Sequence, residues 1–205
     1  MRGANRYTDP GGDARLAHGA ENSARFDHTA RIGRLDSARF DPNAPKPDYL
    51  AVSLAVSAEP FDSDDARRLI AGLDAGLAEL YPPEQRFGPN LKPEHFDDGR
   101  GTFLVARNGG RAVGCGAIRV LDPMSAEVKR MYVEPELRGK GVGMALLTAL
   151  EAAARRLGVQ RLVLETGVYQ DAAIALYKRA GFTQIDCWGE YSSSPSSICY
   201  EKRLI

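Results

Sequence analysis

The chain has 205 residues, of which 43% are hydrophobic and 26% are charged, and this ordinary globular composition excludes a wholly disordered or fibrous protein. Its 27 Lys and Arg balance 27 Asp and Glu, so no broad basic field exists to hold nucleic acid by counterion release. No apolar run reaches the roughly 18 residues of a membrane span, and the N-terminus lacks the apolar region of a secretion signal. We therefore expect a cytoplasmic protein, with neither nucleic acid nor a membrane as its partner.

The first 47 residues differ in composition from the rest of the chain. They are rich in Arg, Gly and Asp and contain few large apolar side chains that could build a core. Residues 41–47, Asp-Pro-Asn-Ala-Pro-Lys-Pro, favour an extended linker because each proline moves its predecessor out of helical space. We therefore predict an N-terminal extension over residues 1–47, either disordered or a loosely docked arm, and one folded domain over residues 48–205.

The folded part begins with a strand and a helix. Residues 49–57 are mostly apolar or small, which is consistent with a strand. The segment Phe61-Asp-Ser63 supplies a helix N-cap, and apolar residues follow at helical spacing until Tyr81-Pro-Pro83 ends the run. Residues 84–100 are polar, contain Gly and Pro, and predict a loop with about one helical turn.

A meander of three strands follows, and then the hydrophobic period changes. Arg107-Asn-Gly-Gly110 lies between two apolar runs and predicts a hairpin, because Asn-Gly tolerates the positive φ angles of a tight turn. Beyond the meander, helices alternate with strands. The fold class is therefore α/β, with a mixed, mostly antiparallel central sheet of about seven strands flanked by helices. We expect strands at residues 102–106, 111–121, 125–133, 161–165, 183–188 and 198–203, and helices at residues 142–157 and 171–179.

The most informative segment is Met131-Tyr-Val-Glu-Pro-Glu-Leu-Arg-Gly-Lys-Gly-Val-Gly143, in which a strand leads through a glycine-rich loop into a helix. Glycines let the backbone approach a ligand, and the first amides of a helix attract an anion. Three glycines with Arg138 and Lys140 exceed what a simple connecting turn requires. The loop therefore predicts a cradle for a diphosphate.

Two familiar phosphate-binding loops are excluded by their register. A Walker A loop needs glycine where Glu134 stands, and in this chain Gly141 follows Lys140 directly. A dinucleotide fingerprint would need glycine at Met144 or at Leu146.

At these residues the sequence resembles the GCN5-related N-acetyltransferase (GNAT) family. The family's acetyl-CoA motif, [Arg/Gln]-x-x-Gly-x-[Gly/Ala], is similar to residues 138–143. A second family stretch is similar to Ala173-Ile-Ala-Leu-Tyr-Lys-Arg-Ala-Gly-Phe182. The resemblance covers about residues 50–203, implies the acyl-CoA N-acyltransferase fold, and says nothing about residues 1–47.

The resemblance also implies a binding site for acetyl-CoA as co-substrate. Backbone groups of Met131 and Val133 would pair with its pantetheine arm, and amides between Arg138 and Gly143 would hold its pyrophosphate. Gln170 stands where the family often has Asn. The cofactor-binding residues expected on this basis are Met131, Tyr132, Val133, Arg138, Gly139, Lys140, Gly141, Val142, Gly143, Gln170 and Tyr177.

Two side chains are candidates for acid and base chemistry. Tyr177 falls at the family's Leu-Tyr position and resembles its general acid; the alternative is that its ring packs on the cofactor without giving up a proton. Glu127 stands at the offset where histone acetyltransferases of the family carry a catalytic glutamate. Strand alternation would place Glu127 on one face with Met131 and Val133. The alternative for Glu127 is an ion pair with Lys129, Arg130 or Arg119.

The remaining polar residues predict no further chemistry. His18, His28 and His95 lack metal-ligand spacing, so we expect no metal. Cys115, Cys187 and Cys199 are odd in number, without CxxC spacing, and are expected to be buried small hydrophobes rather than a disulfide framework.

These observations favour an N-acetyltransferase that transfers the acetyl group of acetyl-CoA to a primary amine by direct attack in a ternary complex. The amine would belong to a small molecule, an amino acid or a peptide. One alternative is a non-catalytic acyl-CoA-binding or sensing module, and another is a protein-modifying acetyltransferase docked through residues 1–47. Edge strands within residues 183–203 could pair in a homodimer.

Overall fold

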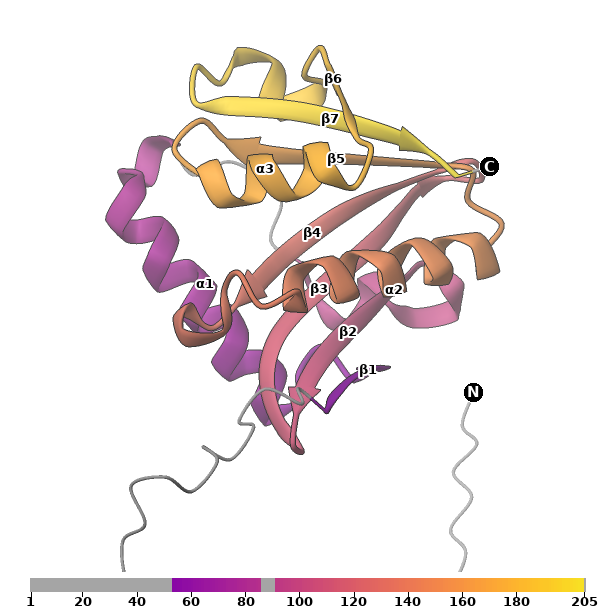
Figure 1. The fold of residues 1–205 in the computed structure, drawn as a ribbon. Coiled ribbons are helices and arrows are strands. Elements are labelled where there is room, and N and C mark those ends of the chain that lie inside the picture. Colours follow the sequence, from indigo (N-terminus) through magenta and orange to yellow (C-terminus); the bar gives the residue numbers. More distant parts are fainter. Residues whose placement is uncertain (1–52, 86–90, 205) are drawn as a thin grey trace, which may run out of the picture. The chain divides into compact units, whose positions relative to one another are not determined.

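The computed structural model describes residues 53–85 and 91–204, which form a seven-stranded mixed sheet with helices on both faces (Figure 1). The strands lie in the order β1-β2-β3-β4-β5-β7-β6. This arrangement confirms the predicted fold class. The predicted extension over residues 1–47 lies outside the described residues, so it stays a prediction, as does the domain boundary at residue 48.

All neighbouring strands are antiparallel except β4 and β5, which pair in parallel. The parallel pair is joined by a helical crossover, as expected from the sequence. The strands are β1 (Leu54–Ala58), β2 (Gly101–Asn108), β3 (Arg111–Asp122), β4 (Ser125–Val133), β5 (Arg161–Gly167), β6 (Thr183–Ile185) and β7 (Ser197–Arg203). The helices are α1 (Asp64–Leu80), α2 (Val142–Arg156) and α3 (Asp171–Arg179).

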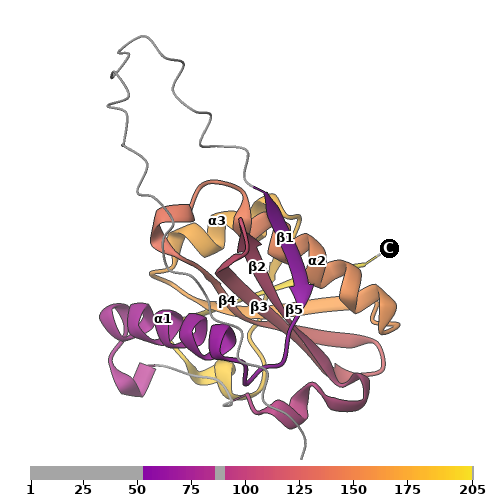
Figure 2. The same cartoon turned by 90° about the horizontal axis from the view of Figure 1, so that it is seen from below.

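Helix α1 covers one face of the sheet, and helices α2 and α3 cover the other (Figures 1 and 2). The side chains on the two faces form separate apolar clusters. On the α1 face, Leu69 packs with Phe103 and Cys115. On the α2 face, Leu146 and Leu164 are fully buried. Burial of these apolar side chains stabilises the two layers and fixes which face each strand residue occupies.

Short polar signals set the helix ends as the sequence predicts. The Ser63 hydroxyl accepts a hydrogen bond of 3.1 Å from the Ala66 N–H, which caps α1, and the helix ends at Leu80 before Tyr81 and two prolines. Three short 3₁₀ turns, rather than one helical turn, occupy the described parts of residues 83–99. The hairpin between β2 and β3 is present, but its left-handed residues are Gly109 and Gly110 rather than Asn-Gly.

Strand β4 contains a bulge at Arg130. Cys115 of β3 faces Tyr132 and Ala117 faces Lys129, so two residues of β4 oppose the single residue Gly116. Arg130 has a φ of 56°, which lies in the left-handed region. The extra residue shifts the strand alternation by one position.

This bulge makes one prediction wrong. Glu127 alternates with Ala126 and Val128 of the α2-side cluster, so its side chain lies on the α1 face. Met131 and Val133 pack against the α2-side cluster. Glu127 therefore does not share a face with Met131 and Val133, because regular alternation does not continue through Arg130.

Strands β4 and β5 are paired only near one end. Ser125 to Val128 of β4 face Arg161 to Leu164 of β5, and the pairing stops there. Figure 1 shows the two arrows close together near the C-terminus and diverging toward α1. The later residues of both strands consequently have no strand partner across the gap that separates them.

The cysteine prediction was wrong for two residues. Cys187 and Cys199 form a disulfide, with their Cα atoms 5.1 Å apart, whereas Cys115 is a buried free thiol. The bond joins the segment after β6 to the middle of β7. Because β7 lies inside the sheet, the outer strand at this end is β6, with three residues. Pairing in a homodimer stays a prediction.

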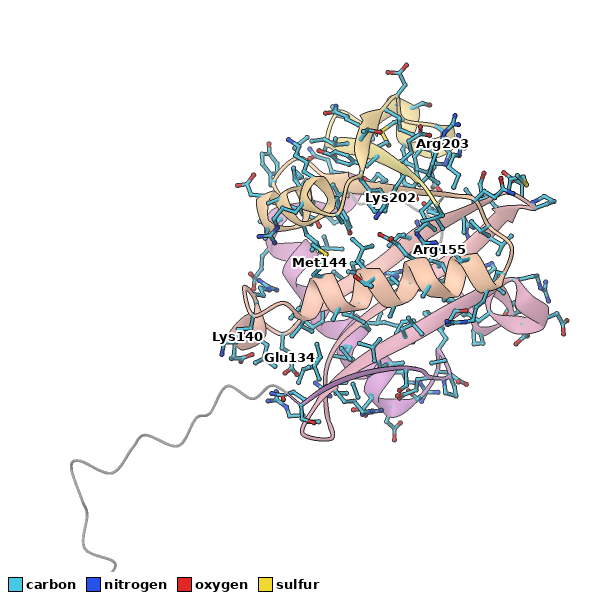
Figure 3. The ribbon with its side chains drawn as sticks, turned by 45° about the vertical axis from the view of Figure 1, so that its right-hand side comes forward. Glu134, Lys140, Met144, Arg155, Lys202 and Arg203 are labelled. Carbon is cyan, nitrogen blue, oxygen red and sulfur yellow. A yellow bond between two sulfur atoms is a disulfide. The ribbon has the colours of Figure 1, made fainter. Side chains whose placement is uncertain are left out.

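Ion pairs tie the crossover helix to the far part of the sheet. Glu151 of α2 is almost buried, and its carboxylate contacts Lys202 Nζ at 2.6 Å and Arg155 at 3.8 Å. Figure 3 shows Arg155 on α2 and Lys202 on β7 on facing elements. Helix α2 is therefore held to β7 as well as to the meander.

Two glycines provide a matched test of backbone conformation. Gly110 has a φ of 86°, Gly76 lies inside α1, and an added Cβ at either meets nothing within 4 Å. We predict that Gly110→Ala lowers the free energy of unfolding by about 1 kcal/mol, because an L-residue is strained in the left-handed region. Gly76→Ala should raise it by about 1 kcal/mol through helix propensity. Urea unfolding of both variants checks this, and changes of the same sign would contradict it.

Candidate functional site

A cleft of about 670 Å³ lies at the open end of β4 and β5. Its walls come from α1, the end of β4, the start of α2, and the segment leading into α3. It brings together most of the predicted binding residues: Met131, Tyr132, Val133, Arg138, Gly139, Gly141, Gly143, Gln170 and Tyr177. It does not include Glu127, Lys140 or Val142 among its lining residues. The sequence prediction missed the contributions of Leu73, Leu77 and Arg179.

One end of the cleft is formed by backbone N–H groups at the start of α2. The Arg138 N–H still donates to Pro135 O, and the Ala145 N–H donates to Gly141 O at 3.0 Å. Within the described residues, no hydrogen-bond acceptor is found for the six backbone N–H groups of residues 139–144. Six successive unpaired donors at a helix N-terminus form a site for an anion.

The conformation of this loop requires glycine. Gly139 has a φ of 74° and Gly141, the N-cap residue of α2, has a φ of 88°. An added Cβ at either position would meet nothing within 4 Å, so space for a ligand remains beside the backbone. A diphosphate therefore fits this end of the cleft through main-chain donors.

The side chains of the same loop point in different directions. The Arg138 Nε donates a hydrogen bond of 3.1 Å to Val133 O, which ties the loop to the end of β4. Figure 3 shows Lys140 at the outer tip of the loop and Met144 directed toward α3. Val142 is buried in the core. Val142 can thus contribute only its backbone groups to the cradle, whereas the Lys140 side chain lies outside the lining of the cleft.

The bulge orients backbone groups of β4 toward the gap. The Glu134 N–H donates to Val113 O of β3 at 2.9 Å. Because successive residues of a strand direct their backbone groups to opposite sides, those of Val133 and Met131 face the gap left by β5. On the other side, the Cys115 thiol donates to Arg130 O at 3.3 Å and helps to hold the bulge. An extended amide-bearing ligand could form a strand-like ladder along this open edge.

Tyr177 of α3 lines the cleft. It is 5% exposed, and its ring packs 5.9 Å from that of Phe182 and 6.4 Å from that of Tyr200, centroid to centroid. Burial raises the pKa of Tyr177, with a smaller contribution from Glu165, so the phenol stays protonated at neutral pH. Gln170 is the N-cap residue of α3 and lines the same cleft. The region can therefore offer a proton donor from a largely apolar wall.

A smaller cavity of about 120 Å³ adjoins the cleft where β4 and β5 separate. It is lined by Leu73, Leu77, Val128, Lys129, Arg130, Met131, Glu165, Thr166, Gln170 and Tyr177. Sequence reasoning missed Glu165. Its signal was a lone carboxylate following the apolar run Leu162-Val-Leu164 at the carboxyl end of a parallel strand, where ligands often bind.

Glu127 is the centre of a buried ionic cluster. Its side chain is 1% exposed, and its carboxylate contacts Arg119 at 2.9 Å and Lys129 Nζ at 3.0 Å. The Tyr191 hydroxyl donates to it at 2.9 Å. The predicted ion pairs with Arg119 and Lys129 are present, whereas Arg130 pairs with Asp74 of α1 at 2.8 Å. This cluster joins β3, β4 and the segment before β7.

Other candidates lie apart from the cleft. His95 Nδ1 accepts a hydrogen bond of 2.9 Å from the Lys92 N–H and lines neither cavity. Burial raises the pKa of the Cys115 thiol to about 12, which leaves it inert as a nucleophile. Among residues 53–85 and 91–204, no group of three His, Cys, Asp or Glu is arranged to hold a metal ion. No helix of those segments is both long and apolar enough to cross a bilayer.

Known proteins are similar to this chain in sequence and in fold. The profile described as "Acetyltransferase (GNAT) family" matches residues 73–182. The IAA acetyltransferase of Azospirillum brasilense is 41% identical over 153 residues, which cover 74% of this chain and 99% of that protein. A crystal structure assigned as an acyl-CoA N-acyltransferase from Klebsiella pneumoniae is 36% identical, with a TM-score of 0.63, and covers 75% of this chain and 99% of its own.

A more distant structure has the same fold. The PaiA N-acetyltransferase of Thermoplasma acidophilum, solved in complex with coenzyme A, has a TM-score of 0.56 at 19% identity. The match covers 74% of this chain and 99% of that one.

Two left-handed glycines allow a controlled test of the cradle. Gly141 (φ 88°) lies at the cleft, and Gly158 (φ 79°) ends α2 at its other end; a Cβ at either meets nothing within 4 Å. We predict that Gly141→Ala weakens coenzyme A binding about tenfold, because relief of about 1–2 kcal/mol of backbone strain reorients the amides. Gly158→Ala should carry the same strain and leave the affinity unchanged. Titration calorimetry checks both, and equal losses in the two variants would contradict the prediction.

Proposed function

The chain belongs to the acetyltransferase (GNAT) family and is an acetyl-CoA-dependent N-acetyltransferase, and from that premise we propose that its acceptor is a primary amine, which attacks bound acetyl-CoA directly in a ternary complex. One observation carries this proposal. The gap between β4 and β5 joins an anion cradle at one end to a cavity that contains both Tyr177 and a carboxylate at the other. That arrangement suits a long phosphorylated donor and a small basic acceptor.

The residues of the cleft fit acetyl-CoA. The backbone amides of residues 139–144 are suited to its pyrophosphate, because they are unpaired and lie at the positive end of α2. Met131 and Val133 turn backbone groups toward the gap, where the amides of the pantetheine arm can pair with them. Leu176 and Ala173 form part of the apolar wall of the cleft. A donor bound in this way carries its thioester toward Tyr177 and the bulge.

Acetyl transfer requires three contributions from the protein. The attacking nitrogen must lose a proton, the carbonyl oxygen must be stabilised as it becomes negative, and the departing sulfur must gain a proton. We assign the last role to Tyr177, whose raised pKa keeps it protonated and whose ring lines both cavities. The backbone N–H of Met131 or Val133 is our candidate for the oxyanion donor, since neither is needed by β3.

Glu127 could act as a general base or as a structural residue, and its contacts support the structural role. As a general base it would have to reach the amine, through a water, from a site that is 1% exposed. As a structural residue it holds Lys129, Arg119 and Tyr191 in place. We propose the structural role, in which its double ion pair orients the acceptor side of the cavity.

The enzyme assay that tests the proposed acceptor is thiol release from acetyl-CoA. The panel should contain alkyl amines, amino acids and peptides, together with alcohols of matched shape. Turnover with amines and none with alcohols is expected. Binding of acetyl-CoA without thiol release for any amine would contradict the proposal and favour the sensing module.

Tyr177→Phe tests the acid. We predict that it lowers kcat about tenfold to a thousandfold, because the thiolate must then leave without a positioned donor. The affinity for acetyl-CoA should change less than twofold, since the ring remains in place. Tyr200→Phe is the matched control, because Tyr200 packs against Tyr177 but lines neither cavity. An unchanged kcat in Tyr177→Phe would remove the hydroxyl from the mechanism.

A further inference from the structure

We propose that Glu165, rather than Glu127, is the general base that takes the proton from the acceptor amine. This inference rests on the proposed function, because it assigns a catalytic residue to the same site. Three observations support it. Glu165 lies at the fork of the sheet, the point where β4 and β5 separate; it lines a cavity together with Tyr177; and its side chain lies on the α1 face of the sheet.

Glu165 is the first residue of β5 beyond the parallel pairing. Leu164 faces Val128 of β4, and after this pair the two strands separate. The side chain of Glu165 therefore lies where the gap begins. It lines the small cavity together with Lys129, Arg130 and Tyr177. A group held between the strands meets Glu165 at the narrow end of the gap.

Glu165 and Tyr177 approach this cavity from opposite faces of the sheet. Leu162 and Leu164 belong to the α2-side cluster, as does Tyr177. Strand alternation then turns Glu165 to the α1 face, where Leu73 and Leu77 of α1 complete the cavity. Tyr177, the proton donor for the sulfur, thus lies on the same face of the sheet as α2, and the N-terminus of α2 forms the cradle. The carboxylate lies on the opposite face, from which an acceptor can enter.

The two glutamates differ in their availability. Glu127 is fully buried and is neutralised by Arg119 and Lys129. Glu165 is partly exposed, and the one hydrogen bond to its carboxylate within the described residues comes from the Ser197 hydroxyl at 2.5 Å. A hydroxyl donor to one oxygen leaves the other oxygen with lone pairs for an ammonium. Glu165 consequently meets the geometric requirement for a base that Glu127 does not meet.

The surroundings of Glu165 also make it a stronger base than a solvated glutamate, because they raise its pKa. Burial raises its pKa, while the hydrogen bond from Ser197 and the charge of Lys129 oppose that rise. Glu127 and Glu190 add to the rise. The titratable and charged groups facing it are Glu127, Lys129 and Arg130 from β4, Tyr177 from α3, Tyr81 after α1, and Glu190 and Tyr191 before β7.

The proton transfers balance as follows. The ammonium gives one proton to Glu165, and the nitrogen lone pair forms the bond to the carbonyl carbon. The carbon–sulfur bond then breaks, and the sulfur takes the Tyr177 proton. The second N–H proton of the attacking nitrogen restores the Tyr177 hydroxyl. Glu165 finally releases its proton to water, so each thiol formed is accompanied by one proton.

The experiment compares Glu165→Gln, Glu127→Gln and Glu190→Gln in the full chain with an accepted amine. Glutamine has nearly the same shape and still accepts the Ser197 hydrogen bond. We expect Glu165→Gln to lower kcat/KM at neutral pH about a hundredfold, with acetyl-CoA affinity unchanged within about twofold. The parent rate should fall as the pH falls through the raised pKa of Glu165, and this acid limb should vanish in Glu165→Gln. Glu190, which is exposed, serves as the control for loss of a nearby negative charge.

Amines of graded pKa separate a base from a residue that only positions the acceptor. An amine that is already neutral needs no base, so the deficit of Glu165→Gln should shrink as the amine pKa falls or as the pH rises. A uniform deficit across amines would overturn the proposal. Loss of the acid limb in Glu127→Gln alone would assign the role to Glu127. If the parent releases no thiol with any amine, the proposed function itself fails, which distinguishes that case from an active parent with an unaffected Glu165→Gln.

Discussion

The site depends on the early end of the hydrogen bonding between β4 and β5. Four residues on each strand pair in parallel, and beyond Val128 and Leu164 the backbone groups have no partner across the gap. Unpaired backbone groups in a protein interior are costly, so such a gap persists where a ligand can satisfy them. The bulge at Arg130 follows directly after this point, and β4 stays bonded to β3 on both sides of it. The coenzyme can then take the place of a missing strand.

The charged and polar groups along this gap lie in the order that the proposed reaction requires. The positive end of α2 and its unpaired amides lie at one end, where the donor carries its phosphates. Near the fork the cavity contains both Lys129 and Glu165, while Tyr177 comes from an apolar wall. In the proposed mechanism, the groups that bind the anion are therefore separate from the groups that transfer protons. The positive environment that binds phosphates therefore does not have to surround Tyr177 and Glu165 as well.

The parts of the site that could be predicted from sequence are those formed by residues that are adjacent in the chain. The loop of residues 138–143 needs particular glycines for its backbone angles, and Tyr177 stands in a motif on a short helix, so both could be found without knowing the fold. The face of Glu127 could not, because one extra residue at Arg130 reverses the alternation and nothing in Lys-Arg-Met marks the bulge. Glu165 and the bond between Cys187 and Cys199 depend on which strands become neighbours, namely β5 with β4 on one side and β7 on the other.

The cross-link between Cys187 and Cys199 encloses the two residues that donate hydrogen bonds to these glutamates, Tyr191 to Glu127 and Ser197 to Glu165. In the chain-entropy description, closing a loop of this length removes about 3 kcal/mol of conformational freedom from the unfolded chain. Cys199 also lies directly across from Glu165 in the sheet. The covalent bond thus restricts this segment before any substrate arrives, and the ordering of its donors does not have to be subtracted from the affinity for the acceptor. The candidate site is in this respect preorganised by a covalent bond outside it.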